Sequence, residues 1–255
     1  MFKTLEIERV DGLGYLWLNR PNRLNALSLE MLNDLSEAAR WFDKHESVRA
    51  VIVGGRGRAF SAGADLAGFP ALSDGDLRVA ADAGRVMADA IEGMRAITIA
   101  QIQGWCVGGG LVLAAACDLR IASDTTKFSI PEIDLGIPLA WGGIARLVRE
   151  IGPALTKELV MTCREFGANE AKLSGFLNRV VAEQELDSAV ELLATKIAEK
   201  PARPIQSTKA HVNAVTAQMV GVVNSWSDAD GLIGGLLDAE CQIAREAYVK
   251  ARTKK

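Results

Sequence analysis

The pattern of hydrophobic and polar positions changes from strand period to helix period within the first 45 residues. Residues 3–10 and 13–19 alternate between apolar and polar, and Asp11-Gly12 between them is typical of a two-residue hairpin turn. Ser28 is a suitable N-cap for the segment that follows. Apolar residues there recur at helical spacing, at Leu29, Leu32, Leu35, Ala39 and Phe42. We therefore expect a β-hairpin followed by a helix that covers one face of a sheet.

Three short apolar runs further along the chain predict buried strands. They lie at residues 50–53, 97–102 and 119–122, and helical sequence links each run to the next. Repeated strand–helix units favour an α/β fold. Residues 67–77, rich in Gly, Ala, Ser and Asp, predict a loop, which either covers a site or is an ordinary surface loop.

Beyond residue 142 the pattern is mainly helical. Only residues 177–182 have the pattern of a strand there. Helical spacing covers 183–200, 203–223 and 230–252, and prolines punctuate the first junction. We interpret residues 1–200 as an α/β core and residues 201–255 as a helical C-terminal region.

Composition excludes several classes of protein. The 255 residues, 49% of them hydrophobic, supply the core of one large domain, or of a core with a small appendage. A net charge of −3 and a pI near 5.6 argue against a general nucleic-acid surface. Four cysteines without a CxxC pair predict reduced thiols in a cytoplasmic protein and no metal site. No stretch is long and apolar enough to span a bilayer.

The candidate chemistry lies at a glycine run and one glutamate. Gly108-Gly109-Gly110 joins an apolar strand to an Ala/Leu helix, so that bare backbone N–H groups at a helix N-terminus are available to an oxyanion or a phosphate. Tight strand–helix packing is the alternative explanation for the glycines. Glu132 is a carboxylate in a largely apolar run, either a catalytic acid/base or a group hydrogen-bonded in a turn. Trp105 and Trp141 are interpreted as packing residues, and Phe69 either lines a pocket or anchors its own loop.

Several motifs in order along the chain resemble the crotonase (enoyl-CoA hydratase/isomerase) superfamily. They cover most of residues 1 to about 200, which makes them more specific than any single glycine motif. The matching segments are Asn19-Arg20-Pro21, Leu24-Asn25-Ala26-Leu27, Phe60-Ser61-Ala62-Gly63-Ala64-Asp65-Leu66, Gly108-Gly109-Gly110, Cys117-Asp118, Arg120-Ile121-Ala122, Pro131-Glu132, Leu135-Gly136-Ile137 and Trp141-Gly142-Gly143.

The resemblance implies a fold, a ligand class and a set of site residues. The fold would be a spiral of ββα units with a helical C-terminal region that builds trimers or dimers of trimers. The substrate would be an acyl-CoA or enoyl-CoA thioester, with coenzyme A bound only as part of the substrate and no permanent cofactor. The backbone N–H groups of Ala64 and Gly109 would hold the thioester oxygen, and Glu132 would transfer protons. Coenzyme A contacts would fall at Arg23, Leu24, Ala62, Asp65, Leu66 and Lys250.

The sequence departs from the hydratase pattern at Val112. Hydratases of this family activate water with two glutamates; the second matches Glu132, but Val112 stands in the place of the first. Valine cannot accept a proton or orient water, which favours movement of a double bond from Δ3 to Δ2 by one glutamate. Ala140 replaces an aspartate of the dienoyl-isomerase and dehalogenase branches. A hydratase with an atypical single-glutamate site and a non-catalytic acyl-CoA-binding protein remain the alternatives.

Overall fold

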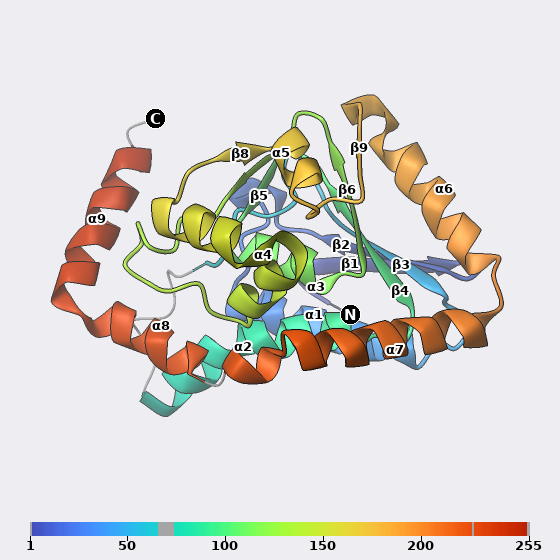
Figure 1. The fold of residues 1–255 in the computed structure, drawn as a ribbon, viewed down its shortest axis with the longest axis horizontal. Coiled ribbons are helices and arrows are strands. Elements are labelled where there is room, and N and C mark those ends of the chain that lie inside the picture. Colours follow the sequence, from blue (N-terminus) through green and yellow to red (C-terminus); the bar gives the residue numbers. More distant parts are fainter. Residues whose placement is uncertain (1, 66–73, 226, 254–255) are drawn as a thin grey trace.

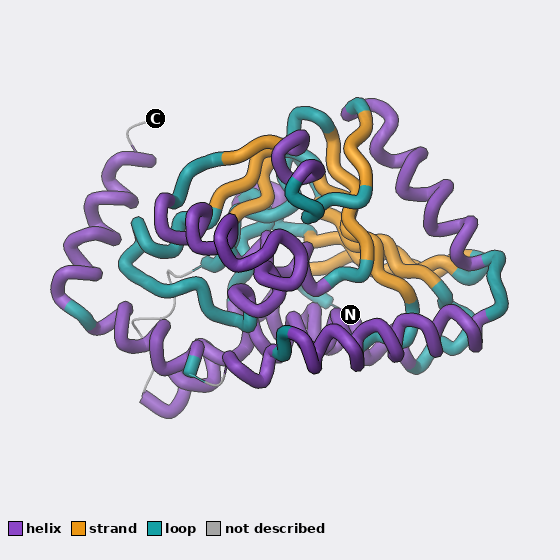
Figure 2. The backbone as a smooth tube through the Cα atoms, viewed as in Figure 1, coloured by secondary structure: helices purple, strands orange, loops and turns teal. Residues whose placement is uncertain are grey.

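The computed structural model describes residues 2–65, 74–225 and 227–253 and has an α/β fold with helices around two sheets (Figures 1 and 2). Its strands are β1 (Leu5–Val10), β2 (Leu13–Leu18), β3 (Ala50–Gly55), β4 (Ile97–Ile102), β5 (Trp105–Val107), β6 (Leu119–Ser123), β7 (Lys127–Ser129), β8 (Phe166–Gly167) and β9 (Arg179–Val181). Its α-helices are α1 (Leu29–Asp43), α2 (Asp74–Glu92), α3 (Gly109–Ala116), α4 (Gly143–Thr162), α5 (Ala168–Leu173), α6 (Leu186–Ala198), α7 (Ala202–Met219), α8 (Asp228–Leu237) and α9 (Ala239–Thr253).

The larger sheet contains the strands that the sequence predicts. Its order is β1-β2-β3-β4-β6-β9, antiparallel in the β1–β2 hairpin and parallel elsewhere. Asp11 and Gly12 both have positive φ, which is the conformation of a tight hairpin turn. Ser28 caps α1 by accepting a hydrogen bond from the Met31 N–H. The hairpin, the first helix and the three central strands are thus confirmed.

Side chains of the central strands alternate between two hydrophobic clusters, one on each face of this sheet. Val51 and Val53 of β3 belong to the main core beneath α1, α2 and α3. Ala50 and Ile52 belong to a smaller cluster beneath α6. Because both faces are covered, β3 is a run of apolar residues and glycine, rather than an alternation of apolar and polar residues.

A second, smaller sheet was not predicted. It has the order β5-β7-β8, and its strands are only two or three residues long. β4 and β5 precede α3, and β6 and β7 precede α4, so each unit gives one strand to each sheet before its helix. This is the ββα spiral that the sequence predicts. Strands this short leave no alternating pattern to detect.

The C-terminal helices lie along the outside of the core, with α7 along one side and α8 and α9 at one end (Figure 1). The helical pattern of residues 230–252 corresponds to two helices, since α8 ends at Leu237 and α9 begins at Ala239. Asp238 between them is extended, and its carboxylate accepts a hydrogen bond from the Cys241 N–H. The break lets α8 pack on α2.

A buried ion pair attaches α7 to the core. Lys209, 8% exposed, donates to Asp118 at 2.7 Å and to the Ala96 carbonyl at 3.0 Å. The same Asp118 oxygen accepts from the backbone N–H and the hydroxyl of Thr98. Helix α7 is therefore joined to the core by a charged side chain.

We predict that Asp118→Ala lowers the free energy of unfolding by about 3 kcal/mol, because it leaves the buried Lys209 ammonium without its counter-ion. Urea denaturation measures the change. Glu30→Ala is the control: it removes an exposed partner of Lys3 and should cost less than about 1 kcal/mol. Equal effects of the two substitutions would show that charge does not hold α7 in place.

Candidate active site

The two glycine-containing turns of the sequence motifs lie side by side. The Ser61 N–H donates to the Trp105 carbonyl, and the Val107 N–H donates back to the Ser61 carbonyl, each at 3.0 Å. Gly63 has a φ of +92°, and a Cβ on it would lie 2.9 Å from the Val107 oxygen and 3.6 Å from the Gly109 nitrogen. Glycine is therefore required there, and it allows the chain before Ala64 to reach the start of α3.

The backbone N–H groups of Ala64 and Gly109 have no hydrogen-bond acceptor among the described residues, and both residues line one cavity. Gly109 is the first residue of α3, where the helix dipole favours negative charge. The Ser61 hydroxyl fixes the other turn, since it accepts from the Gly63 N–H and donates to the Asn25 carbonyl. This arrangement can bind an oxyanion.

Glu132 is buried beside these donors. Its carboxyl group packs directly on Gly108, where a Cβ would overlap Oε1. Only 7% of the residue is exposed, and Oε2 has no hydrogen-bond partner among the residues that the structure describes. The pKa of this carboxyl is raised to about 7. Burial raises the pKa, and a hydrogen bond to the backbone N–H of Glu132 itself offsets only part of that rise. Glu132 can thus exchange a proton near neutral pH.

The cavity beside Glu132, hereafter the Glu132 cavity, has mainly apolar walls. It is lined by Ala64, Gly109, Val112, Glu132, Ile137, Pro138, Leu139, Ala140, Trp141 and Leu232. Its volume is about 20 Å³, room for about one water molecule. Leu232 comes from α8, and the Asp228 carboxylate at the start of that helix accepts from the Gly142 N–H at 2.8 Å. Helix α8 of the same chain therefore closes one side.

Glu132 is the one carboxylate among the described residues that line the cavity. Val112 is fully buried in the cavity wall, where the sequence places the missing glutamate, and Ala140 lies in the same wall. Asp134 is exposed, because residues 131–136 form a turn rather than an extended strand. A site with a single carboxyl group follows from these placements.

Trp141 packs between helices, as expected, and also lines the cavity. Its indole lies against Gly84 of α2 and Gly109 of α3, at positions where a Cβ would overlap the ring. The packing role is confirmed. The residue is also part of the cavity wall and has a φ of +63°. Its buried indole N–H has no partner within the described part of the chain. Sequence reasoning missed this donor because nothing in the motif indicates which way the ring edge faces.

Of the residues expected to contact coenzyme A, some lie near the turn that carries Ala64 and one lies on α9. The Leu24 carbonyl accepts from the Ala62 N–H at 2.8 Å, next to the turn that carries Ala64, and Arg23 is exposed on the preceding 3₁₀ turn. The Asp65 carboxylate pairs with Arg20 at 3.0 Å.

Lys250, by contrast, is exposed near the end of α9 and is not part of the cavity wall. Leu66 and Phe69 lie outside the described residues. Leu232 was missed, since no sequence motif connects α8 to the glycine run.

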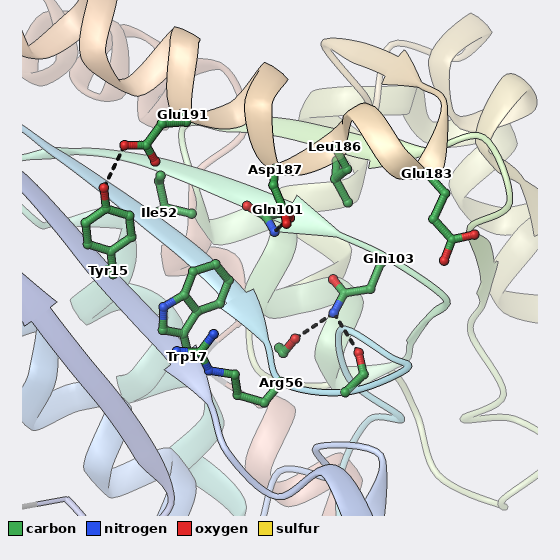
Figure 3. A pocket seen from close by; sticks show the side chains of 12 residues that line it. Tyr15, Trp17, Ile52, Arg56, Gln101, Gln103, Glu183, Leu186, Asp187 and Glu191 are labelled. Carbon is green, nitrogen blue, oxygen red and sulfur yellow. Dashed lines mark hydrogen bonds between the residues drawn. The ribbon is translucent and has the colours of Figure 1, made fainter.

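A second cleft lies between the larger sheet and α6, and Figure 3 shows its side chains. The Trp17 indole packs on Gly54 and beneath the Arg56 guanidinium, and the Tyr15 hydroxyl donates to Glu191. Burial and the Glu191 carboxylate raise the pKa of Tyr15 to about 12, so its hydroxyl stays protonated at neutral pH. Ala64, Gly109 and Glu132 do not line this cleft. The Glu132 cavity is therefore the better candidate for the active site.

Residues 2–65, 74–225 and 227–253 contain no group of three or more His, Cys, Asp and Glu side chains that could hold a metal ion. None of the helices in these ranges has both the length and the apolar character needed to cross a membrane.

Comparison with known proteins agrees with the geometry. A model of the family described as enoyl-CoA hydratase/isomerase matches residues 8–233. A Mycobacterium bovis protein named "Probable enoyl-CoA hydratase echA8" is 38% identical over 215 residues, which cover 83% of this chain and 82% of that protein. An Arabidopsis thaliana protein named peroxisomal Delta(3,5)-Delta(2,4)-dienoyl-CoA isomerase is 35% identical over 225 residues, 82% of this chain and 81% of that protein.

The solved structures agree on the fold. An enoyl-CoA hydratase/isomerase from Xanthobacter autotrophicus Py2 superimposes with a TM-score of 0.88 at 27% identity, over 100% of this chain and 94% of that chain. The predicted crotonase fold is thereby confirmed. With its family match, its relatives and its pair of glycine turns beside a buried glutamate, this chain belongs to the enoyl-CoA hydratase/isomerase family.

Proposed function

We propose that this enzyme moves a double bond in an enoyl-CoA thioester from Δ3 to Δ2, with Glu132 as the only acid/base. The observation that carries the proposal is the pairing of Glu132 with Val112 in one cavity wall. Addition of water across a double bond relies in this family on two carboxyl groups, whereas a proton shift needs one. A pKa near 7 suits a group that must both accept and return a proton.

The proposed reaction begins when the Glu132 carboxylate removes a proton from C2 of the 3-enoyl thioester. The electron pair moves into the carbonyl, and the N–H groups of Ala64 and Gly109 hold the resulting dienolate oxygen. Such preorganised donors are each worth about 10²–10³ in rate. The protonated Glu132 then gives the proton to C4, the double bond forms between C2 and C3, and the carboxylate is restored.

Binding of the coenzyme A portion is proposed at the turn next to Ala64. Leu24 and Ala62 are hydrogen-bonded to each other there, and the exposed Arg23 supplies a positive charge. Asp65 is proposed to act through its pair with Arg20, which supports this turn. Contributions of Leu66 and Lys250, and assembly into trimers or dimers of trimers, stay predictions from the family resemblance.

Hydration of a 2-enoyl-CoA is the second candidate. Of eight proteins that are 31–38% identical to this chain, seven are named hydratases and one is named a dienoyl-CoA isomerase. The Glu132 cavity also has room for about one water molecule. Incubation with trans-3-enoyl-CoA and trans-2-enoyl-CoA, with products followed by mass spectrometry and absorbance, separates the two reactions. Water addition without double-bond migration would favour the hydratase.

We predict that Glu132→Gln lowers kcat/KM for isomerisation by about 10²–10⁴-fold, because glutamine cannot accept the C2 proton. Steady-state kinetics with a trans-3-enoyl-CoA measures the loss. Asp134→Asn is the matched control, since it neutralises an exposed carboxylate two residues away and should leave the rate unchanged. If Glu132→Gln retained wild-type activity, Glu132 would not be the base.

We expect kcat/KM to rise with pH and to level off above pH 7. The first step needs the carboxylate form of Glu132, and burial raises its pKa to about 7. Below that pH the ionised fraction falls about tenfold per unit, and the rate should fall with it. A pH–rate profile from pH 5 to 9 tests this. A profile that stayed flat down to pH 5 would mean that the carboxyl titrates at its ordinary pKa or does not act.

We predict that Val112→Glu gains hydration of trans-2-enoyl-CoA by about tenfold or more, because it returns a second carboxyl group to the cavity wall. Val112→Gln is the control for the packing change, because a glutamine side chain has nearly the size and shape of a glutamate side chain but cannot accept a proton. Equal hydration by the two variants would show that the second carboxyl group is not what limits water addition.

A further inference from the structure

Arg146 is a buried charge that the proposed reaction does not use. It lies in the first turn of α4, and only 1% of the residue is exposed. Its Nη2 atom donates to Asp89 at 2.8 Å and to Glu92 at 2.6 Å, both on α2. Burial alone would raise the pKa of Glu92, but the charges of Arg146 and Arg149 lower it below its ordinary value. The guanidinium is therefore paired with ionised carboxylates at neutral pH.

The other terminal nitrogen of Arg146 binds the backbone of the cavity wall. Nη1 donates to the Trp141 carbonyl at 3.1 Å, and the Gly142 N–H donates to the Asp228 carboxylate at 2.8 Å. This carbonyl and this N–H belong to one peptide group, the one that joins Trp141 to Gly142. A cation from α4 and a carboxylate from α8 therefore hold the two ends of the same peptide dipole.

The peptide group after Trp141 needs this support because its backbone conformation is unfavourable. Trp141 has a φ of +63°, in the left-handed region that bulky side chains rarely adopt, and Gly142 follows with a φ of +70°. A Cβ on Gly142 would lie 2.5 Å from Arg146 Nη1, so a side chain there would displace the guanidinium from its carboxylates. Backbone of this kind persists where the surrounding contacts enforce it.

The Trp141 ring connects this peptide group to the oxyanion donors. The indole lies between Gly84 of α2 and Gly109 of α3, each so close that a Cβ would overlap the ring. Gly109 is the first residue of α3, and its N–H is one of the two groups proposed to hold the thioester oxygen. A rotation of the Trp141 peptide group would therefore move the ring against the start of α3 and displace that N–H.

We propose that Arg146 is a positioning residue of the active site. It holds the Trp141 carbonyl, which keeps the indole against Gly109 and the Gly109 N–H in place for the thioester oxygen. Asp228 supports the same peptide group from α8. Arg146 acts through Trp141, since it is not among the described residues that line the Glu132 cavity. The proposal rests on the proposed function in one respect: a thioester oxygen occupies the donors of Ala64 and Gly109.

A second arginine of α4 provides a matched control. Arg149 exposes only 9% of its side chain and also binds Glu92, but it donates to the Val220 carbonyl rather than to Trp141. Arg146→Lys and Arg149→Lys both keep a positive charge beside Glu92 and replace a planar fork with one ammonium group. We expect the lysine at position 146 to stay with the carboxylates and to release the Trp141 carbonyl. Urea denaturation shows that each variant is folded.

The carbonyl of a bound thioester reports on the two donors without any turnover. Acetyl-CoA labelled with ¹³C at the carbonyl carries only a methyl group beyond it, and hydrogen bonds from Ala64 and Gly109 should lower its C=O stretching frequency in infrared difference spectra. We expect wild type and Arg149→Lys to give the same lowering, and Arg146→Lys to lose about half of it, because one of two donors is displaced. Full lowering in Arg146→Lys overturns this proposal alone. No lowering in wild type overturns the proposed oxyanion site as well.

Two substitutions at Asp228 test the other end of the peptide group, and they decide the question if Arg146→Lys does not fold. Asparagine keeps an oxygen that accepts from the Gly142 N–H, whereas alanine offers no acceptor. We expect Asp228→Ala to lose part of the frequency lowering and Asp228→Asn to retain it. Equal spectra for the two variants would contradict the proposal.

Kinetics with a trans-3-enoyl-CoA separate positioning from a general effect of the buried ion pairs. A displaced oxyanion donor acts mainly on the transition state, so Arg146→Lys should lower kcat about tenfold and change KM by less than about twofold. Arg149→Lys should keep kcat within about twofold of wild type. Equal losses of kcat in the two lysine variants would show that the ion pairs, and not the hold on Trp141, matter for the rate.

Discussion

The site depends on the burial of one carboxyl group against a backbone that has no side chain. Glu132 Oε1 occupies the space that a Cβ on Gly108 would fill, and the other carboxyl oxygen, Oε2, is buried. The same glycine run contains Gly109, the first residue of α3. The proton affinity of Glu132 and the stabilisation of an anion by the Gly109 N–H thus depend on the close approach of the Glu132 segment to the glycine run. A side chain at position 108 would push these two segments apart.

The larger sheet was predictable because its strands are buried on both faces. Continuous apolar runs such as residues 50–53 indicate that burial in the sequence itself. The smaller sheet was not predictable, since β8 has two residues and its pairing with β7 is decided by tertiary contacts. The break at Asp238 escaped prediction for a related reason: α8 is separated from α9 by its contacts with α2, which helical periodicity does not encode.

The sequence motifs group Ala64, Gly109, Glu132 and Val112 in one site, and all four residues line one cavity of the structure. They could not place Leu232 or the free N–H of Trp141. Those features depend on how a distant helix docks and on which rotamer a ring adopts between two glycines. The shape of the acyl pocket is therefore a property of packing, whereas the reactive atoms are a property of local sequence.

The contact of α8 with the cavity makes the C-terminal helices part of the same cooperative unit as the site. Asp228 receives the Gly142 N–H, and Arg245 of α9 donates to the carbonyls of Leu135 and Gly235. Local unfolding of these helices would remove the Leu232 wall, release the turn after Glu132 and admit water to its carboxyl group. The acidity of Glu132 is consequently linked to the folding free energy of a segment some hundred residues away in the chain, and destabilising changes in α8 or α9 act on the chemistry without touching a reactive atom.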